Sequence, residues 1–327
     1  MRGPLGGHVK RLRRYGKFQI LLFALAVAGK AYASPDPRLT SLIPSGAQLV
    51  SGISASSFRG QSANFVLMTG NNKLDLADFY ALTGSDVERH IHQVVFVAAS
   101  DASEVLNQHS LLVSGNFNKG RLLKTAAQIG GSIRRYHGIE VAEIQPFERE
   151  RHEFNEIRWL AVFDSGVIGF GSIALMQREL DRFLAHSYAD ELLVRRLSRL
   201  RSKDQTWCVL AGSLKTLPSP RWKNEIRSAL AYVNAGLATE AVSADEFEFG
   251  LFYGRKVELE YFLSRASTEP GGPAIDPYEQ VTLQPFRSTA LLPKLNSTGL
   301  ALAVHDIIAI PVPRFKEWLA KISMSSH

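Results

Sequence analysis

The sequence predicts an α+β fold made of antiparallel hairpins with helices inserted between them. Short apolar or alternating runs recur along the chain and are separated by turn residues, most clearly in residues 247–253 and 257–266, which flank Gly254-Arg255-Lys256. Segments with apolar residues at helical spacing, such as 121–129, lie between such runs. Strand pairs that alternate with single helices are typical of the α+β class.

The first 33 residues are predicted to be a secretory signal peptide. A basic segment without acids precedes the short apolar run 18–29, and a small-x-small site ends at Ala33. The apolar run is shorter than the ~20 residues that span a membrane. We therefore expect cleavage near Ala33 and export, periplasmic or secreted. The Arg13-Arg14 pair leaves the general and twin-arginine routes open.

The charge distribution argues against nucleic acid as a partner. The formal net charge is +7, but residues 1–33 hold seven of the 38 Lys and Arg and none of the 31 Asp and Glu. The remaining chain therefore carries equal numbers of basic and acidic residues. A balanced surface gives no electrostatic attraction to polyanions.

Strands and helices alternate irregularly from residue 34 to about residue 203, which is the predicted first module. The predicted strands are 47–54, 65–68, 92–100, 109–117, 138–146, 157–163 and 167–171. The predicted helices are 74–84, 121–129, 173–186 and 191–203.

The predicted second module covers residues 204–327, with the boundary near residues 201–205. Its strands are expected at 206–213, 247–253, 257–266 and 299–313, and its helices at 224–238 and 315–322. Cys208, the single cysteine, is expected to be a buried strand residue because its neighbours are apolar and β-prone. Residues 271–286 are expected to form a long loop.

The two halves are compatible with a duplication, which the sequence leaves open. Val50 falls opposite Val209 at an offset of 159, and the segment at 138 falls opposite the segment at 299 at an offset of 161. Identity between the halves is low, and β-rich chains produce such matches by chance.

Three stretches carry a resemblance to known sequences: PSGAQLVSGI (44–53), LTGSDVERHIHQVVFVA (82–98), and GNFNKGRLLKTAAQIGG with YHGIEV (115–141). They resemble a group of uncharacterised secreted proteins of acidobacterial type over residues 40–190. The resemblance implies an exported location and an α+β build. It implies no activity, because that group has no assigned chemistry.

Two glycine-rich turns resemble nucleotide-binding motifs but lack their context. Gly169-x-Gly171-x-x-Ala174 follows the return strand of a hairpin, whereas a dinucleotide site needs a βαβ unit. Ser172 is expected to cap the helix that follows. The 115–122 turn lacks the Lys-Ser/Thr pair of a P-loop. We therefore expect no cofactor.

No metal or catalytic group is evident. His90-x-His92 gives two imidazoles at strand spacing without a third ligand, and a zinc site needs at least three. No Gly-x-Ser-x-Gly motif is present, and the one cysteine has no visible partner base.

The basic amphipathic segment 191–203 is the candidate interaction surface. Leucines at 193, 197 and 200 share one face, and the basic side chains occupy the remainder: Arg195, Arg196, Arg199, Arg201 and Lys203. Such a helix packs its leucines on a core and solvates its arginines, or it binds an acidic partner or an anionic membrane.

The leading hypothesis is an exported, non-enzymatic protein that binds a partner or acts in the cell envelope. One alternative is an exported hydrolase whose catalytic residues are scattered through the sequence. Another is peripheral membrane association through residues 191–203.

Overall fold

The structure is a computed structural model. It describes residues 35–54, 66–69, 72–75, 91–101, 104–128, 130–144, 158–200, 204–210, 227, 244–253, 256–265 and 302–311.

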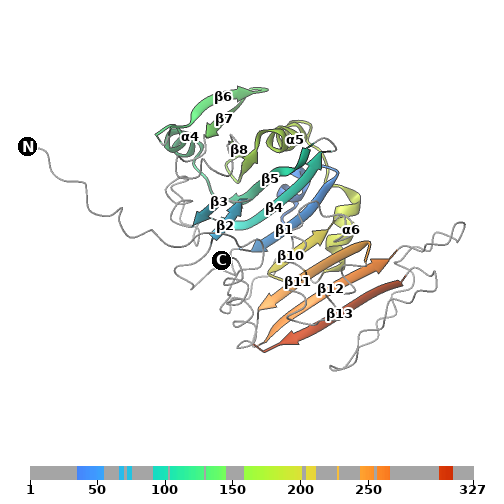
Figure 1. Cartoon of the computed structure of the whole chain (residues 1–327). Coiled ribbons are helices and arrows are strands. Elements are labelled where there is room, and N and C mark those ends of the chain that lie inside the picture. Colours follow the sequence, from blue (N-terminus) through green and yellow to red (C-terminus); the bar gives the residue numbers. More distant parts are fainter. Residues whose placement is uncertain are drawn as a thin grey trace, which may run out of the picture.

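One antiparallel sheet of 11 strands organises the described chain (Figure 1). Its spatial order is β13-β12-β11-β10-β1-β4-β5-β9-β8-β7-β6. The strands of the first half are β1 (Ala47–Ser54), β4 (Ile91–Asp101), β5 (Glu104–Gly115), β6 (Ser132–Tyr136), β7 (Ile139–Ile144), β8 (Arg158–Asp164) and β9 (Val167–Ser172). Those of the second half are β10 (Thr206–Leu210), β11 (Glu246–Tyr253), β12 (Val257–Arg265) and β13 (Leu302–Ile310). A separate hairpin pairs β2 (Val66–Thr69) with β3 (Asn72–Asp75).

The two halves of the chain meet at the centre of this sheet. β1 pairs antiparallel with β10, and Val50 lies opposite Val209. The hairpin β4–β5 continues the sheet on one side, and the hairpin β11–β12 continues it on the other. The fold is therefore α+β, as predicted, with both halves in one continuous sheet.

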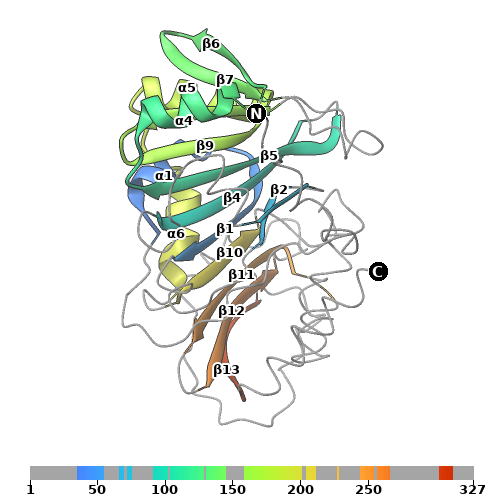
Figure 2. The same cartoon turned by 90° about the vertical axis from the view of Figure 1, so that its left-hand side faces the viewer.

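Four helices have described bounds: α1 (Pro37–Leu42), α4 (Lys119–Gln128), α5 (Ile173–Leu184) and α6 (Glu191–Arg199). α1, α5 and α6 contribute leucines to one core with Val50, Val95 and Trp207 of the sheet. α4 packs on the other face of β7 and β8, against Ala142 and Leu160. Figure 2 shows α1 and α6 beside the part of the sheet that contains β1 and β10.

Local sequence explains the helix ends at this face. The Asp36 carboxylate accepts a hydrogen bond from the Arg38 backbone N–H at 3.0 Å and so caps α1, and Pro37 occupies its first turn. The Asp190 carboxylate caps α6 by accepting from Leu193 N–H at 3.1 Å. No described helix is long and apolar enough to cross a membrane.

The predicted strands agree with the observed ones to within a few residues wherever they are described. The helix predicted from residue 74 is wrong at its start, because Leu74 lies in β3 and pairs with Leu67. The hairpin strand β6 and the short helix α1 were not predicted. The remainder of 74–84, the predicted helices 224–238 and 315–322, and the predicted loop 271–286 lie outside the described residues, apart from Arg227.

Candidate functional site

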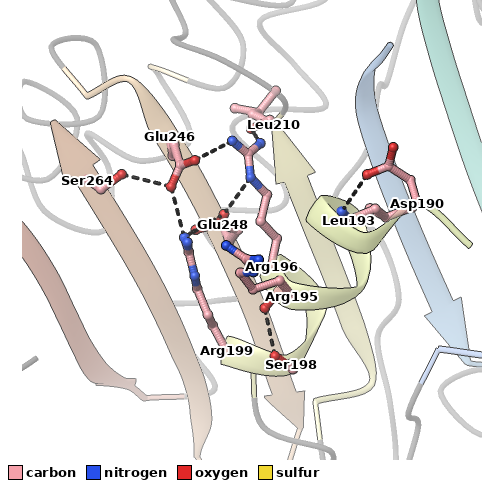
Figure 3. A network of polar contacts seen from close by, with 10 residues as sticks. All are labelled: Asp190, Leu193, Arg195, Arg196, Ser198, Arg199, Leu210, Glu246, Glu248 and Ser264. Carbon is pink, nitrogen blue, oxygen red and sulfur yellow. Dashed lines mark hydrogen bonds and ion pairs between the residues drawn. The ribbon is translucent and has the colours of Figure 1, made fainter. Parts of the chain in front are cut away.

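The basic helix α6 packs on the sheet through an internal network of ion pairs (Figure 3). Arg196 reaches β11, where its Nη2 lies 2.5 Å from Glu246 Oε1, and its Nη1 donates to the Leu210 carbonyl at 2.7 Å. Its side chain is 7% exposed. The guanidinium therefore connects α6 to two neighbouring strands.

Arg199 completes the network one turn later. Its Nη1 lies 3.1 Å from Glu246 Oε2 and 3.1 Å from Glu248 Oε1. The guanidinium carbon lies 4.1 Å from the centre of the Phe262 ring, a cation–π distance. Ser264 Oγ donates to Glu246 at 2.9 Å. Two cations thus face two carboxylates beneath the helix.

Burial and charge act in opposite directions on the two carboxylates. Burial is the largest influence on Glu246 and tends to raise its pKa, but Arg196, Ser264 and Arg199 together outweigh it and the pKa is lowered. Glu248 is fully buried, and this burial raises its pKa to about 7 despite Arg199 and Arg196.

The expectation that Arg196 and Arg199 face solvent is wrong, because both side chains are buried against Glu246 and Glu248. Arg195 is exposed, as expected. Arg201 and Lys203 lie outside the described residues. An interaction through residues 191–203 stays a prediction that the two buried arginines do not support.

A cavity of about 650 Å³ lies where α1, the α5–α6 connection and α6 meet the central strands. Most of its described lining is apolar. The lining residues are Pro35, Pro37, Thr40, Ser41, Ser187, Tyr188, Ala189, Val194, Leu197, Ser198, Leu200, Asp204 and Trp207.

Two glycines make room for the two residues that line this cavity from the sheet side. Gly52 on β1 lies opposite Trp207 on β10, and a Cβ at Gly52 would overlap the indole. Gly250 on β11 lies on the other side of Trp207, and a Cβ there would overlap the carboxylate of Asp204. The indole and the carboxylate therefore occupy spaces that side chains would otherwise fill.

Arg182 of α5 joins two walls of the cavity. Its Nε donates to the carbonyl of Ser41 at 2.8 Å, at the end of α1. Its Nη2 donates to the carbonyl of Tyr188 in the α5–α6 connection. The backbone N–H of Asp36 donates to Gln93 Oε1 at 2.7 Å, which fixes the start of α1 on β4. The cavity thus has walls that are held in place without a ligand.

An exposed apolar side chain stands at this cavity. Tyr188 is 93% exposed although it also contributes to the lining. Val194, another lining residue, is 48% exposed. These two exposed side chains indicate where the cavity opens to solvent.

The glycines of the 169–174 motif have a packing role. β9 pairs antiparallel with both β5 and β8, so no parallel βαβ unit surrounds them. A Cβ at Gly169 would meet Met176 and Phe163 at 2.8 Å, and one at Gly171 would overlap the backbone of β5. Ser172 stands at the predicted N-cap position of α5, but its side chain makes no capping bond.

Polar groups outside the cavity are buried in the core. Ser110 Oγ donates to Glu179 Oε1, and both residues are fully buried between β5 and α5. Burial raises the pKa of Glu179 to about 8. Cys208 is fully buried, as predicted, and burial raises the pKa of its thiol. Among the described residues, no three His, Cys, Asp or Glu side chains cluster as metal ligands, and His90 is not described.

Comparisons with known proteins give little beyond this geometry. No protein-family model matches the chain, and no curated protein is significantly similar to it. A solved structure titled "Structure of crystal form I of TP0453" aligns with a TM-score of 0.41 and 14% identity, over 88% of this chain and 98% of that chain.

Proposed function

We propose that this protein is an exported, non-enzymatic binding protein that holds a small, mainly apolar ligand in the cavity between α1 and α6. The single observation that carries the proposal is the cavity itself, about 650 Å³ with mostly apolar lining. Ligand sites in proteins are clefts of roughly 300–1,000 Å³ lined by apolar and aromatic side chains with a few polar groups. The cavity falls within that range of size and chemistry.

The construction of the cavity supports binding rather than accidental loose packing. Arg182 ties Ser41 to Tyr188, and the Arg196 and Arg199 ion pairs fix α6 on the sheet. Walls that are already in position spare a ligand the entropic cost of ordering them. These hydrogen bonds and ion pairs hold the cavity open, as a binding site requires.

The hydrolase alternative finds less support in the described residues. Cys208 is inaccessible inside β10, and the contact of Ser110 with Glu179 lies in the core, where no substrate reaches. Export rests on the N-terminal sequence pattern, which belongs to residues outside the described part of the chain.

Titration with Nile red, a neutral dye that fluoresces in apolar sites, tests the proposal. We expect saturable one-to-one binding by the native protein. Ala189→Trp adds an indole to the cavity wall and should weaken binding ~10-fold or more, as a steric block costing at least 1.4 kcal/mol would do. Ala127→Trp, on the exposed face of α4, is the matched control and should bind like the native protein.

Absence of saturable binding, or equal binding by all three proteins, would refute a ligand site in this cavity. In the first case the protein binds no ligand of this class, and in the second the dye binds elsewhere.

We also propose that the halves 34–203 and 204–327 are tandem related modules. Support comes from the placement of Val50 opposite Val209 at the centre of the sheet, because the offset of 159 pairs these same residues. Each central strand is followed outward by a hairpin, β4–β5 or β11–β12. The match between the segments at 138 and 299 gives no support. The segment at 299 leads into β13, which lies beside β12, so a duplication would place β7 beside β5. The strand beside β5 is β9 instead.

A further inference from the structure

Three of the hydroxyl groups that line the cavity are hydrogen-bond acceptors toward its interior. Thr40 Oγ1 donates to the Pro37 carbonyl at 3.2 Å, and Ser41 Oγ donates to the Arg38 carbonyl at 2.9 Å. Ser198 Oγ donates to the Arg195 carbonyl at 2.7 Å. Each hydroxyl has one hydrogen and two lone pairs. With the hydrogen given to the helix backbone, only the lone pairs are left for a ligand.

A carboxylate adds to this set of acceptors. Asp204 lines the cavity, is 1% exposed and lies against Gly250. An ionised carboxylate only accepts hydrogen bonds, and it attracts a cation strongly where water is scarce. The acceptors thus come from two helices and from the chain that enters β10.

The aromatic part of the lining favours the same sign of charge. Trp207 and Tyr188 both contribute to the cavity. The faces of indole and phenol rings attract cations within about 6 Å of the ring centre. The indole Nε1–H of Trp207 is buried and has no acceptor among the described residues. This N–H is neutral and does not offset the repulsion between the Asp204 carboxylate and an anionic ligand.

We infer that the ligand of this cavity is an organic amine: an apolar body with a protonated amino group that the cavity hydroxyls, Asp204 and the aromatic rings receive. This inference rests on the proposed function and names its ligand class. An ammonium group supplies three hydrogen-bond donors and one positive charge, which match acceptors that have no hydrogen left to offer. The apolar body lies along the proline and leucine walls.

Competition of bound Nile red by three ligands of equal chain length tests the inference. Decylamine, decanol and decanoate share their alkyl chain and differ in the head group. At pH 7 the amine is protonated and the carboxylate ionised, as the ordinary pKa values of such groups, about 10 and about 4, require. We expect decylamine to bind ~10-fold more tightly than decanol, as one charge-assisted hydrogen bond would provide, and decanoate to bind least.

Two variants separate head-group recognition from general apolar binding. Asp204→Asn removes the negative charge and replaces one acceptor oxygen by an N–H donor, so it should abolish the preference for decylamine over decanol. The affinity for decanol should stay within about two-fold, because decanol carries no charge. Ser198 lies on an exposed helix position, so Ser198→Ala should fold like the native protein. It serves as the test variant if Asp204→Asn does not fold. Ser198→Ala should lower the affinity for decylamine several-fold, because one hydrogen bond to the ammonium group is lost. Ala189→Trp should lower the affinity for all three ligands.

The outcomes distinguish this inference from the proposed function. Equal binding of decylamine and decanol, or tighter binding of decanoate, overturns the amine while the cavity remains a binding site. An unchanged affinity for decylamine in Ala189→Trp also overturns it, since the amine then binds elsewhere. If no ligand displaces Nile red and the dye itself does not saturate, the proposed function fails as well.

Discussion

The indole ring of Trp207 on β10 lies against Gly52 on β1, across the strand pair that joins the two halves of the chain. A Cβ at Gly52 would overlap the indole. Gly52→Ala should therefore push the ring toward the cavity, lower the free energy of unfolding by about 1–3 kcal/mol and weaken Nile red binding. Chemical denaturation and dye titration measure the two effects.

Gly120→Ala is the matched control for this substitution. A Cβ at Gly120 would meet only Asn118 Oδ1, at 3.6 Å, and alanine favours the helix α4. If Gly52→Ala has the same free energy of unfolding and the same dye affinity as the native protein, the described position of Trp207 is contradicted.

The ion pairs of α6 should be structural. Arg199→Ala leaves Glu246 and Glu248 with one cation fewer in a buried site, and we expect a loss of about 3–5 kcal/mol in the free energy of unfolding. Arg195→Ala, one turn earlier on the exposed face, should change it by less than about 0.5 kcal/mol. Urea denaturation of both variants gives the comparison. If both variants change the free energy of unfolding by equally small amounts, Arg199 does not form these buried ion pairs.

The buried Glu179 should make stability depend on pH. Its pKa in the folded protein is raised to about 8 from an ordinary value of 4.5, so the folded state holds a proton that the unfolded state releases between these values. Stability should therefore fall as pH rises from about 4.5 to about 8, by at most about 1.4 kcal/mol per pH unit.

Glu179→Gln keeps an acceptor for Ser110 and removes the titrating group. Its melting temperature should exceed that of the native protein at pH 8, and the difference should shrink toward pH 5. A difference that does not vary with pH would show that Glu179 does not carry this dependence.

Arg182 should affect ligand affinity through the position of the cavity walls. Arg182→Lys keeps the charge but replaces the fork of N–H donors that joins the Ser41 and Tyr188 carbonyls. We expect several-fold weaker Nile red binding, with faster dissociation, because the α5–α6 connection loses its tie to α1. Arg121→Lys on the exposed face of α4 serves as control. An unchanged dissociation rate in Arg182→Lys would mean that other contacts hold the walls.

The sequence predicted the strands and the class of the fold because alternation and turn residues act locally. Cys208 could be placed in a buried strand from its immediate neighbours alone. α1 was missed because six residues give little periodicity, although Asp36-Pro37 is a helix-start signal that identifies it in retrospect.

The site could not be predicted in the same way. The local sequence predicts that Arg196 and Arg199 face solvent, because their partners Glu246 and Glu248 lie about 50 residues away in the chain. The cavity joins residues 35–41 to residues 187–207, and the pairing of β1 with β10 and the hydrogen bonds of Arg182 bring these segments together. A long-range juxtaposition of this kind leaves no local pattern.

Photo-crosslinking with a decylamine analogue that carries a diazirine on its alkyl chain tests the central claim most directly. After irradiation and digestion, mass spectrometry identifies the labelled residues. The account predicts adducts on the cavity lining in segments 35–41 and 187–200, and unlabelled decylamine should suppress them. Adducts distributed over the exposed surface, or concentrated on α4 and the β6–β7 hairpin, would contradict a ligand site between α1 and α6.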